Sequence, residues 1–161
     1  MKNKMTEKLF ELAYTDSMTE VQNRNAYEER LKKLRKPNAN ISLITVIVVD
    51  VNGLKEINDS YGHFCGDDAI KTNAKGLRDT IGIKADMYRI GGDEFVCISE
   101  SNVLPYISQF KDTIYFINNE KLYNLSVSIG YSRFHEKYSK SIDDIICRAD
   151  EKMYKDKKSK K

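Results

Sequence analysis

The chain has 161 residues, of which 40% are hydrophobic and 32% are charged, and these values fit one globular domain with a substantial core. Its formal net charge of +3 is too small to indicate a nucleic-acid partner by itself, and much of the positive excess lies in the lysine-rich tail 152–161. The longest apolar run, Ile41–Val49, is far too short to cross a bilayer, and residues 1–11 lack the apolar stretch of a signal peptide.

The cysteines bear on the cellular compartment. The three of them, Cys65, Cys97 and Cys147, are far apart in the sequence and form no C-x-x-C pair. We therefore expect reduced, mostly packed thiols and a cytoplasmic segment that makes no membrane contact.

The first expected element is a helix over Lys2–Tyr14, because Met5, Leu9 and Leu12 recur at helical spacing. This helix precedes the compact part of the sequence. Residues 1–15 therefore form either a connector to another segment or a helix that packs on its own domain.

A polar segment then leads into a second helix, with Tyr27, Leu31 and Leu34 on one face. Thr19 and Gln22 fit a capping box near its start. Such a cap is a sufficient structural reason for both residues.

The sequence Ile41–Val49 is almost continuously apolar and β-branched, which is typical of a strand buried on both faces. It ends at Asp50, and a charge at the end of a central strand marks a candidate site. A short helix over Leu54–Tyr61 follows, and Gly66 with Asp67 is expected to open a longer helix.

Two apolar runs, Met87–Ile90 and Phe95–Ile98, flank the tetrapeptide Gly91-Gly92-Asp93-Glu94. Adjacent glycines between strands predict a hairpin, because glycine adopts the positive φ values that a tight turn needs. A plain turn does not require two carboxylates at its tip. Acids beside glycines instead favour a site where a divalent cation is held against a bulky anion.

The remaining sequence predicts a helix over 103–117, a half-buried strand over 125–131 and a last helix that a capping box of Ser141 and Asp144 begins. The order of elements contains a β-α-β-β-α-β core, the α+β arrangement of ferredoxin-like folds, with extra N- and C-terminal helices. In that fold the first strand pairs antiparallel with the third. Asp50 should therefore lie beside Asp93 and Glu94.

Three carboxylates this close repel one another, so the cluster needs a bound cation or protonation of some of its acids. Oxygen ligands without His or Cys favour Mg²⁺ or Mn²⁺, which take further ligands from phosphates and water. The glycines at 53, 91 and 92 leave room for such phosphates. Nucleotidyl transfer is the chemistry that this combination favours. The alternative is a set of solvated acids at strand ends.

Five motifs in order resemble those of the GGDEF family, the diguanylate cyclases, whose fold resembles the palm domain of cyclases and polymerases. The resemblance covers residues 16–161 and implies that they form the catalytic domain, with 1–15 as a connector helix. The motifs are Asp16 to Arg24, Asp50 to Asp67, Gly91-Gly92-Asp93-Glu94-Phe95, Ser126 to Gly130, and Ala149 to Tyr154.

The resemblance implies the catalytic roles. Asp50, Asp93 and the backbone carbonyl of Val51 would ligate the metal, and Glu94 would join a second metal. Asp93 would also be the base for the ribose 3′-hydroxyl. Lys55 would stabilise charge on the triphosphate, whereas its structural alternative is an exposed helix lysine.

The resemblance also implies substrate contacts. A carboxylate accepts hydrogen bonds from the guanine N1–H and 2-amino group, a pattern that adenine does not offer. The structural alternatives are a helix cap for Asp67 and a packed side chain for His63. The substrate-binding residues would be Gly53, Leu54, Asn58, His63, Asp67 and, for phosphate, Lys157.

Two departures from the family pattern stand out. An arginine common near the C-terminus is replaced by Lys161, which lacks the bidentate fork of a guanidinium. The inhibitory product motif R-x-x-D falls on Gly82 and Ala85, so we expect no product inhibition of that type.

The function implied is condensation of two GTP into cyclic di-GMP and two pyrophosphates by a homodimer of facing domains, with a sensory domain joined through the first helix. The first alternative is a GTP-binding regulatory or partner-binding module without turnover. The second, an RNA-binding module, predicts aromatic residues on a central strand, and Val96-Cys97-Ile98 shows none.

Overall fold

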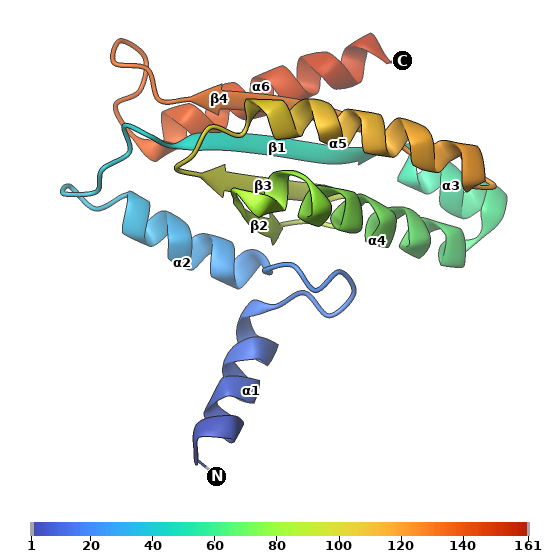
Figure 1. Ribbon diagram of the computed structural model, residues 1–161, viewed down its shortest axis with the longest axis horizontal. Coiled ribbons are helices and arrows are strands. Elements are labelled where there is room, and N and C mark those ends of the chain that lie inside the picture. Colours follow the sequence, from blue (N-terminus) through green and yellow to red (C-terminus); the bar gives the residue numbers. More distant parts are fainter. Residues whose placement is uncertain (1, 161) are drawn as a thin grey trace.

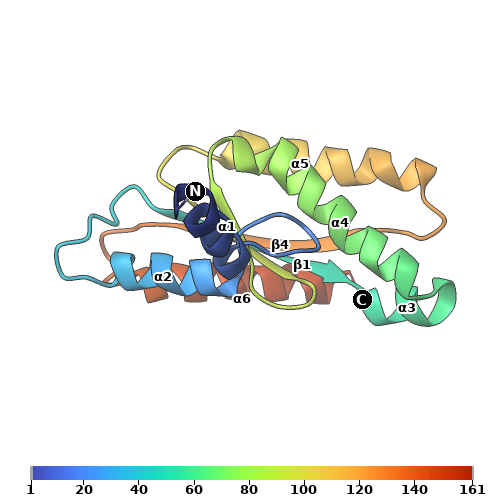
Figure 2. The same cartoon turned by 90° about the horizontal axis from the view of Figure 1, so that it is seen from below.

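The structure is a computed structural model that describes residues 2–160. A central sheet carries α4 and α5 on one face and α2 and α6 on the other (Figures 1 and 2). The elements are α1 (Lys2–Tyr14), α2 (Arg24–Leu34), β1 (Thr45–Asn52), α3 (Leu54–Tyr61), α4 (His63–Asp79), β2 (Asp86–Arg89), β3 (Glu94–Ser99), α5 (Leu104–Ile117), β4 (Ser126–Arg133) and α6 (Ile142–Ser159).

The four strands lie in the order β2-β3-β1-β4, and every neighbouring pair is antiparallel. This is the predicted ferredoxin-like arrangement, with β1 next to β3. The antiparallel register places the end of β1 beside the start of β3. The fold class inferred from the order of elements is therefore confirmed.

Strand β1 is buried from Thr45 to Val51, which explains its continuous apolar sequence. Alternate residues face two different cores, so that Ile47 packs toward α4 and α5 whereas Val48 packs toward α2 and α6. The predicted start at Ile41 is wrong by several residues. A turn precedes the strand, and Leu43 in that turn is 63% exposed.

One predicted helix cap and one predicted helix start are also wrong. The side chain of Asn23, rather than Thr19 with Gln22, caps α2 by accepting a hydrogen bond from the Ala26 N–H. The hydroxyl of Thr19 donates instead to Asp16. Helix α4 begins at His63, before the predicted Gly66-Asp67 pair, because the chain turns sharply at Gly62, whose φ is +85°.

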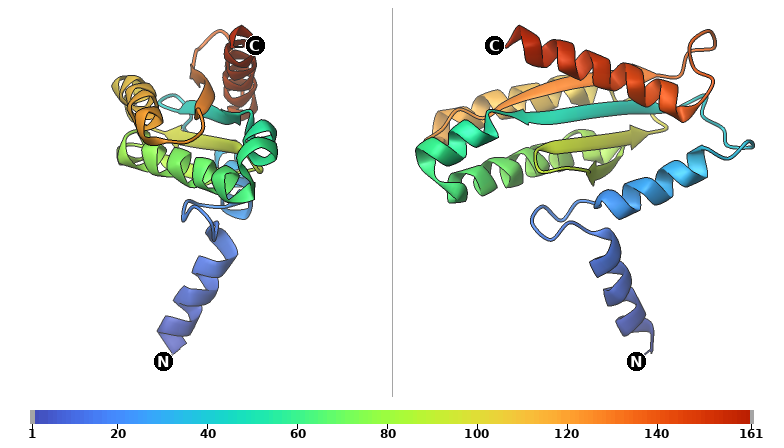
Figure 3. Two further views of the ribbon diagram at one scale, coloured as in Figure 1. Left: turned by 90° about the vertical axis from the view of Figure 1, so that its right-hand side faces the viewer. Right: turned by 180° about the vertical axis from the view of Figure 1, so that it is seen from behind.

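Helix α6 covers the edge strand β4 (Figure 3). Gly130 permits a very close approach, since a Cβ at this position would lie 2.0 Å from the Ala149 carbonyl oxygen. The predicted capping box of Ser141 and Asp144 is present at the helix start. Side chains at the end of α6 also satisfy outward-facing groups of the strand: Asp156 accepts from the Ile129 N–H, and Lys160, which follows the helix, donates to the Val127 carbonyl.

Helix α1 projects away from the sheet (Figures 1 and 3). Its apolar residues Met5, Leu9 and Leu12 are 71%, 60% and 71% exposed, so this stripe does not pack on the domain. Within residues 2–160, none of the helices combines the length and apolar character needed to span a bilayer.

Candidate active site

The register of β1 and β3 brings the signature acids to Asp50. Asp50 lies directly opposite Glu94 in the antiparallel pair. The N–H of Val51 donates a 3.0 Å hydrogen bond to the carbonyl oxygen of Asp93, which fixes the hairpin tip against the end of β1. The predicted convergence of the three acidic residues is therefore present in the fold.

Asp50 is only 5% exposed and accepts a 2.7 Å hydrogen bond from the ammonium of Lys157 on α6. Burial raises the pKa of the Asp50 carboxyl, the hydrogen bond from Lys157 opposes that rise, and the charge of Asp93 adds to it. The same hydrogen bond raises the pKa of Lys157. Because the pKa of Asp50 is raised on balance, the ammonium of Lys157 does not fully compensate the cost of burying the ionised carboxylate.

Glu94 experiences the same concentration of negative charge. Burial raises its pKa, and the neighbouring charges of Asp93, Asp50 and Asp150 raise it further. Asp150 comes from α6 and also raises the pKa of Asp50. Sequence reasoning placed Asp150 in a family motif but gave it no role, because only the packing of α6 on the sheet brings it to this edge.

The acids of this edge suit a hard divalent cation, since they offer carboxylate and backbone oxygens, and burial followed by the charges of neighbouring carboxylates raises the pKa of Asp50 and Glu94. Among residues 2–160, however, no group of three or more His, Cys, Asp or Glu side chains has the arrangement of a metal site. Lys157 instead provides the positive charge beside Asp50. The residues thus fit Mg²⁺ or Mn²⁺ chemically, with Asp50, Asp93, Glu94 and the Val51 carbonyl as the oxygens available to hold it.

A cavity of about 600 Å³ opens beside this edge. It combines Asp93 with three ammonium groups, and Gly53 at its wall has a left-handed φ of +64° that turns the chain into α3. A cavity with this lining suits an anion held with a cation. Its residues are Val51, Asn52, Gly53, Leu54, Lys55, Glu56, Ile57, Asp93, Asn124, Ser126, Lys157 and Lys160.

The predicted guanine-contacting residues lie apart from this cavity lining, on α3 and the first turns of α4. Gly66 packs against Asn58 so closely that a Cβ there would lie 1.9 Å from the Asn58 Oδ1. His63 and Asp67 are exposed at the start of α4. The capping alternative for Asp67 is wrong because α4 begins at His63, and the packed alternative for His63 is wrong because its side chain is exposed.

The hairpin glycines do not adopt the predicted left-handed conformation. Neither Gly91 nor Gly92 has a positive φ. A Cβ on Gly91 would lie 2.6 Å from the Glu94 Oε2, so this glycine leaves room for the Glu94 side chain. Arg89 holds the tip by donating a 2.8 Å hydrogen bond to the Gly92 carbonyl, and it pairs with Asp16 at 3.1 Å. Arg89 thereby connects Asp16 of the first motif with the Gly91–Phe95 motif, a contact that the sequence did not reveal.

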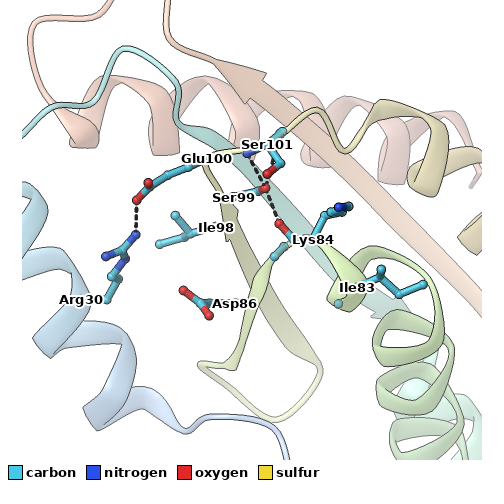
Figure 4. A pocket seen from close by; sticks show the side chains of 10 residues that line it. Arg30, Ile83, Lys84, Asp86, Ile98, Ser99, Glu100 and Ser101 are labelled. Carbon is cyan, nitrogen blue, oxygen red and sulfur yellow. Dashed lines mark hydrogen bonds and ion pairs between the residues drawn. The ribbon is translucent and has the colours of Figure 1, made fainter.

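A second hollow of about 410 Å³ lies where the absent product motif would fall, and it includes Gly82 and Ala85 (Figure 4). Its charges are mixed. The guanidinium of Arg30 is engaged by Glu100 at 2.8 Å, and Asp86 adds a further carboxylate. This hollow does not restore the R-x-x-D pair.

Comparison with known proteins identifies the family. The model described as diguanylate cyclase, GGDEF domain, matches residues 13–161. The probable diguanylate cyclase DgcI of Escherichia coli strain K12 is 32% identical over 153 residues, covering 94% of this chain and 33% of that protein. A diguanylate cyclase of Vibrio cholerae is 31% identical over 170 residues, covering 96% of this chain and 50% of that protein.

Solved structures agree on the fold. The coiled coil and GGDEF domain of DgcB from Caulobacter crescentus, in complex with c-di-GMP, superimposes with a TM-score of 0.81 at 22% identity and covers 98% of this chain and 87% of that chain. The chain spans between a third and a half of the length of the two relatives above. Since the family model covers the fold and every motif of the site, the chain belongs to the GGDEF domain family of diguanylate cyclases.

Proposed function

We propose that this chain is a diguanylate cyclase domain, which condenses two GTP into cyclic di-GMP and two pyrophosphates. The observation that carries the proposal is the convergence of Asp50, Asp93 and Glu94 beside a cavity that Lys55 and Lys157 line. The names of the two similar bacterial proteins support the same activity.

The carboxylates and the Val51 carbonyl would hold Mg²⁺ or Mn²⁺. When bound, the metal would supply Lewis-acid polarisation of the phosphate oxygens and would lower the pKa of the attacking hydroxyl. Asp93 would take the proton of the ribose 3′-hydroxyl. The 3′-oxygen would form a bond to the α-phosphorus of the second GTP, and the bond from that phosphorus to pyrophosphate would break.

Lys55 and Lys157 would stabilise negative charge on the triphosphate. Lys157 has a second role in this proposal, because its ammonium pairs with the buried Asp50 carboxylate. On nucleotide and metal binding it would exchange Asp50 for a phosphate oxygen. Gly53 and Leu54 would offer backbone N–H groups at the start of α3 to the same phosphates.

Asn58, His63 and Asp67 would contact the guanine. Asn58 and Asp67 come from consecutive helices that Gly66 holds in close contact. The Asp67 carboxylate would accept from N1–H and the 2-amino group, which selects guanine over adenine.

Each domain would hold one GTP, so turnover requires two domains that face each other and depends on the dimer population. Helix α1 would connect the domain, which we place at residues 16–161, to an upstream sensory segment. Its exposed apolar stripe and its projection from the sheet support this role.

The decisive experiment incubates the chain at high concentration with GTP and Mg²⁺ and separates the products by chromatography. We expect cyclic di-GMP and pyrophosphate from the native chain and neither from Asp93→Ala. Asp112→Ala removes an exposed carboxylate on α5, away from the cavity, and serves as the matched control. Absence of product from the native chain at any protein concentration would contradict the proposal.

A second candidate is a regulatory module that binds GTP without turnover. The ion pair of Lys157 with Asp50, in a site without a ready three-residue metal arrangement among the described residues, favours it. Binding of GTP without product in the same experiment would select this candidate.

A further inference from the structure

A short polar network lies on the same face of the sheet as Asp50. Asn52 follows the predicted metal ligands on β1 and lies opposite Ser126 of β4, and Asp50 lies opposite Ser128. Asn52 donates from Nδ2 to the Ser126 Oγ at 2.9 Å, and its Oδ1 accepts from the Ser128 hydroxyl at 2.7 Å. One amide thus joins the two serines.

The burial of Ser128 fixes the direction of this network. Ser128 is completely buried, and in the described part of the chain its hydroxyl donates to one acceptor, the Asn52 Oδ1. If the amide were turned over, the buried hydroxyl would face an NH₂ group and lose that acceptor. The oxygen of Asn52 therefore points to Ser128 and its nitrogen points to Ser126.

The hydroxyl of Ser126 therefore already accepts one hydrogen bond and can still donate one. Its Oγ accepts from Asn52, and within residues 2–160 no side chain or backbone oxygen receives its own hydroxyl proton. Ser126 also lines the 600 Å³ cavity that contains Asp93, Lys55 and Lys157. Its free donor is thus available to an acceptor within that cavity.

We propose that Ser126 is a substrate-positioning residue that donates a hydrogen bond to a phosphate oxygen of the bound nucleotide. The network Ser128–Asn52–Ser126 aligns this donor in advance. The acceptor is anionic because the exposed ammonium group of Lys55 lines the same cavity, and Lys157 would add a second positive charge once it exchanges Asp50 for the nucleotide. This inference rests on the proposed GTP site and adds a neutral donor to its charged groups.

The test measures the Kd of the non-reacting analogue guanosine 5′-(α,β-methylene)triphosphate, with Mg²⁺, by calorimetry. Ser126→Ala should raise this Kd about ten-fold, the effect of losing one hydrogen bond to a charged group. Ser126→Thr keeps the hydroxyl and should restore binding to near the native value. Guanosine, which has no phosphates, should bind both variants and the native chain equally.

Ser132→Ala is the matched control, because Ser132 is buried on the same face of β4 but contacts Arg148, outside the cavity. It should leave the Kd of the analogue unchanged. An unchanged Kd in Ser126→Ala, with native binding intact, would overturn this inference and leave the proposed function standing. Failure of the native chain to bind the analogue would overturn both. An equal loss for guanosine and the analogue, or no recovery in Ser126→Thr, would also overturn the phosphate contact.

Discussion

The two halves of the candidate site are built in different ways. The carboxylate edge is formed by neighbouring strands and by α6, with Asp50 buried and joined to Lys157, a residue 107 positions away in the sequence. The end proposed for guanine is formed by two consecutive helices, and His63 and Asp67 lie exposed on α4. Strand register and helix packing thus position the groups proposed for chemistry, whereas local helix geometry positions those proposed for base selection. Changes at the two halves should therefore have different consequences.

The largest effect should come from Lys157→Ala at the carboxylate edge. This change leaves the buried Asp50 without its ion-pair partner and removes a positive charge from the 600 Å³ cavity. Cyclic di-GMP formation should therefore fall about 100-fold, in the range seen when one electrostatic stabiliser is lost. The measurement is the initial rate of product formation. Lys158→Ala removes the adjacent exposed lysine and should retain the native rate; equal losses in both variants would mean that general charge, rather than the Asp50 contact, matters.

The next effect tests how α6 is held against the sheet. Gly130→Ala should lower the free energy of unfolding by about 2–3 kcal/mol, because the added methyl group meets the backbone of α6 at Ala149 and Met153. Urea unfolding measures the change. Gly92→Ala provides the contrast, since its added Cβ meets nothing within 4 Å. A native-like stability for Gly130→Ala would show that α6 tolerates displacement.

The guanine end should respond in selectivity rather than stability. Asp67→Asn should reduce the preference for GTP over ATP about ten-fold, because the amide replaces one acceptor of the guanine pattern with a donor. Competition binding with the two nucleotides measures it, together with a thermal melt that should remain native. An unchanged preference would remove Asp67 from the guanine contact.

A smaller effect should appear at Glu94. Its folded-state pKa is raised, so the ionised side chain opposes folding above that pKa, and Glu94→Gln should raise the free energy of unfolding at pH 7 by less than about 1 kcal/mol after solvent screening. As pH falls through the folded and then the unfolded pKa, the native glutamate becomes protonated in both states, and the gain should vanish. A gain that grows toward acidic pH would contradict this explanation.

The smallest expected effect is none at all. Cyclic di-GMP added at the start of the reaction should leave the rate unchanged, because we expect it not to bind in the hollow near Gly82 and Ala85. The Arg30 of that hollow is paired with Glu100, and the R-x-x-D pair is absent. A control with Arg30→Ala should show the same insensitivity. Inhibition that Arg30→Ala relieves would mean that this hollow binds the product without the usual motif.

The amino-acid sequence by itself determined the elements and the acidic edge. Apolar periodicity located the helices and strands, and the predicted strand order placed Asp50 beside Glu94, because antiparallel register follows from topology once the elements are known. The helix over 54–61 and the cap at Ser141 were likewise predictable, since short-range contacts decide them. The motifs also sufficed for the resemblance to the family.

Only the tertiary structure decided which side chains complete that edge. The contact of Lys157 with Asp50, the approach of Asp150 and the alignment of Ser126 by Asn52 all join segments distant in sequence. The room that Gly91 leaves for the Glu94 side chain likewise became visible only in the folded hairpin. These features follow from how closely α6 and the hairpin pack on the sheet, and no local pattern of residues encodes that distance.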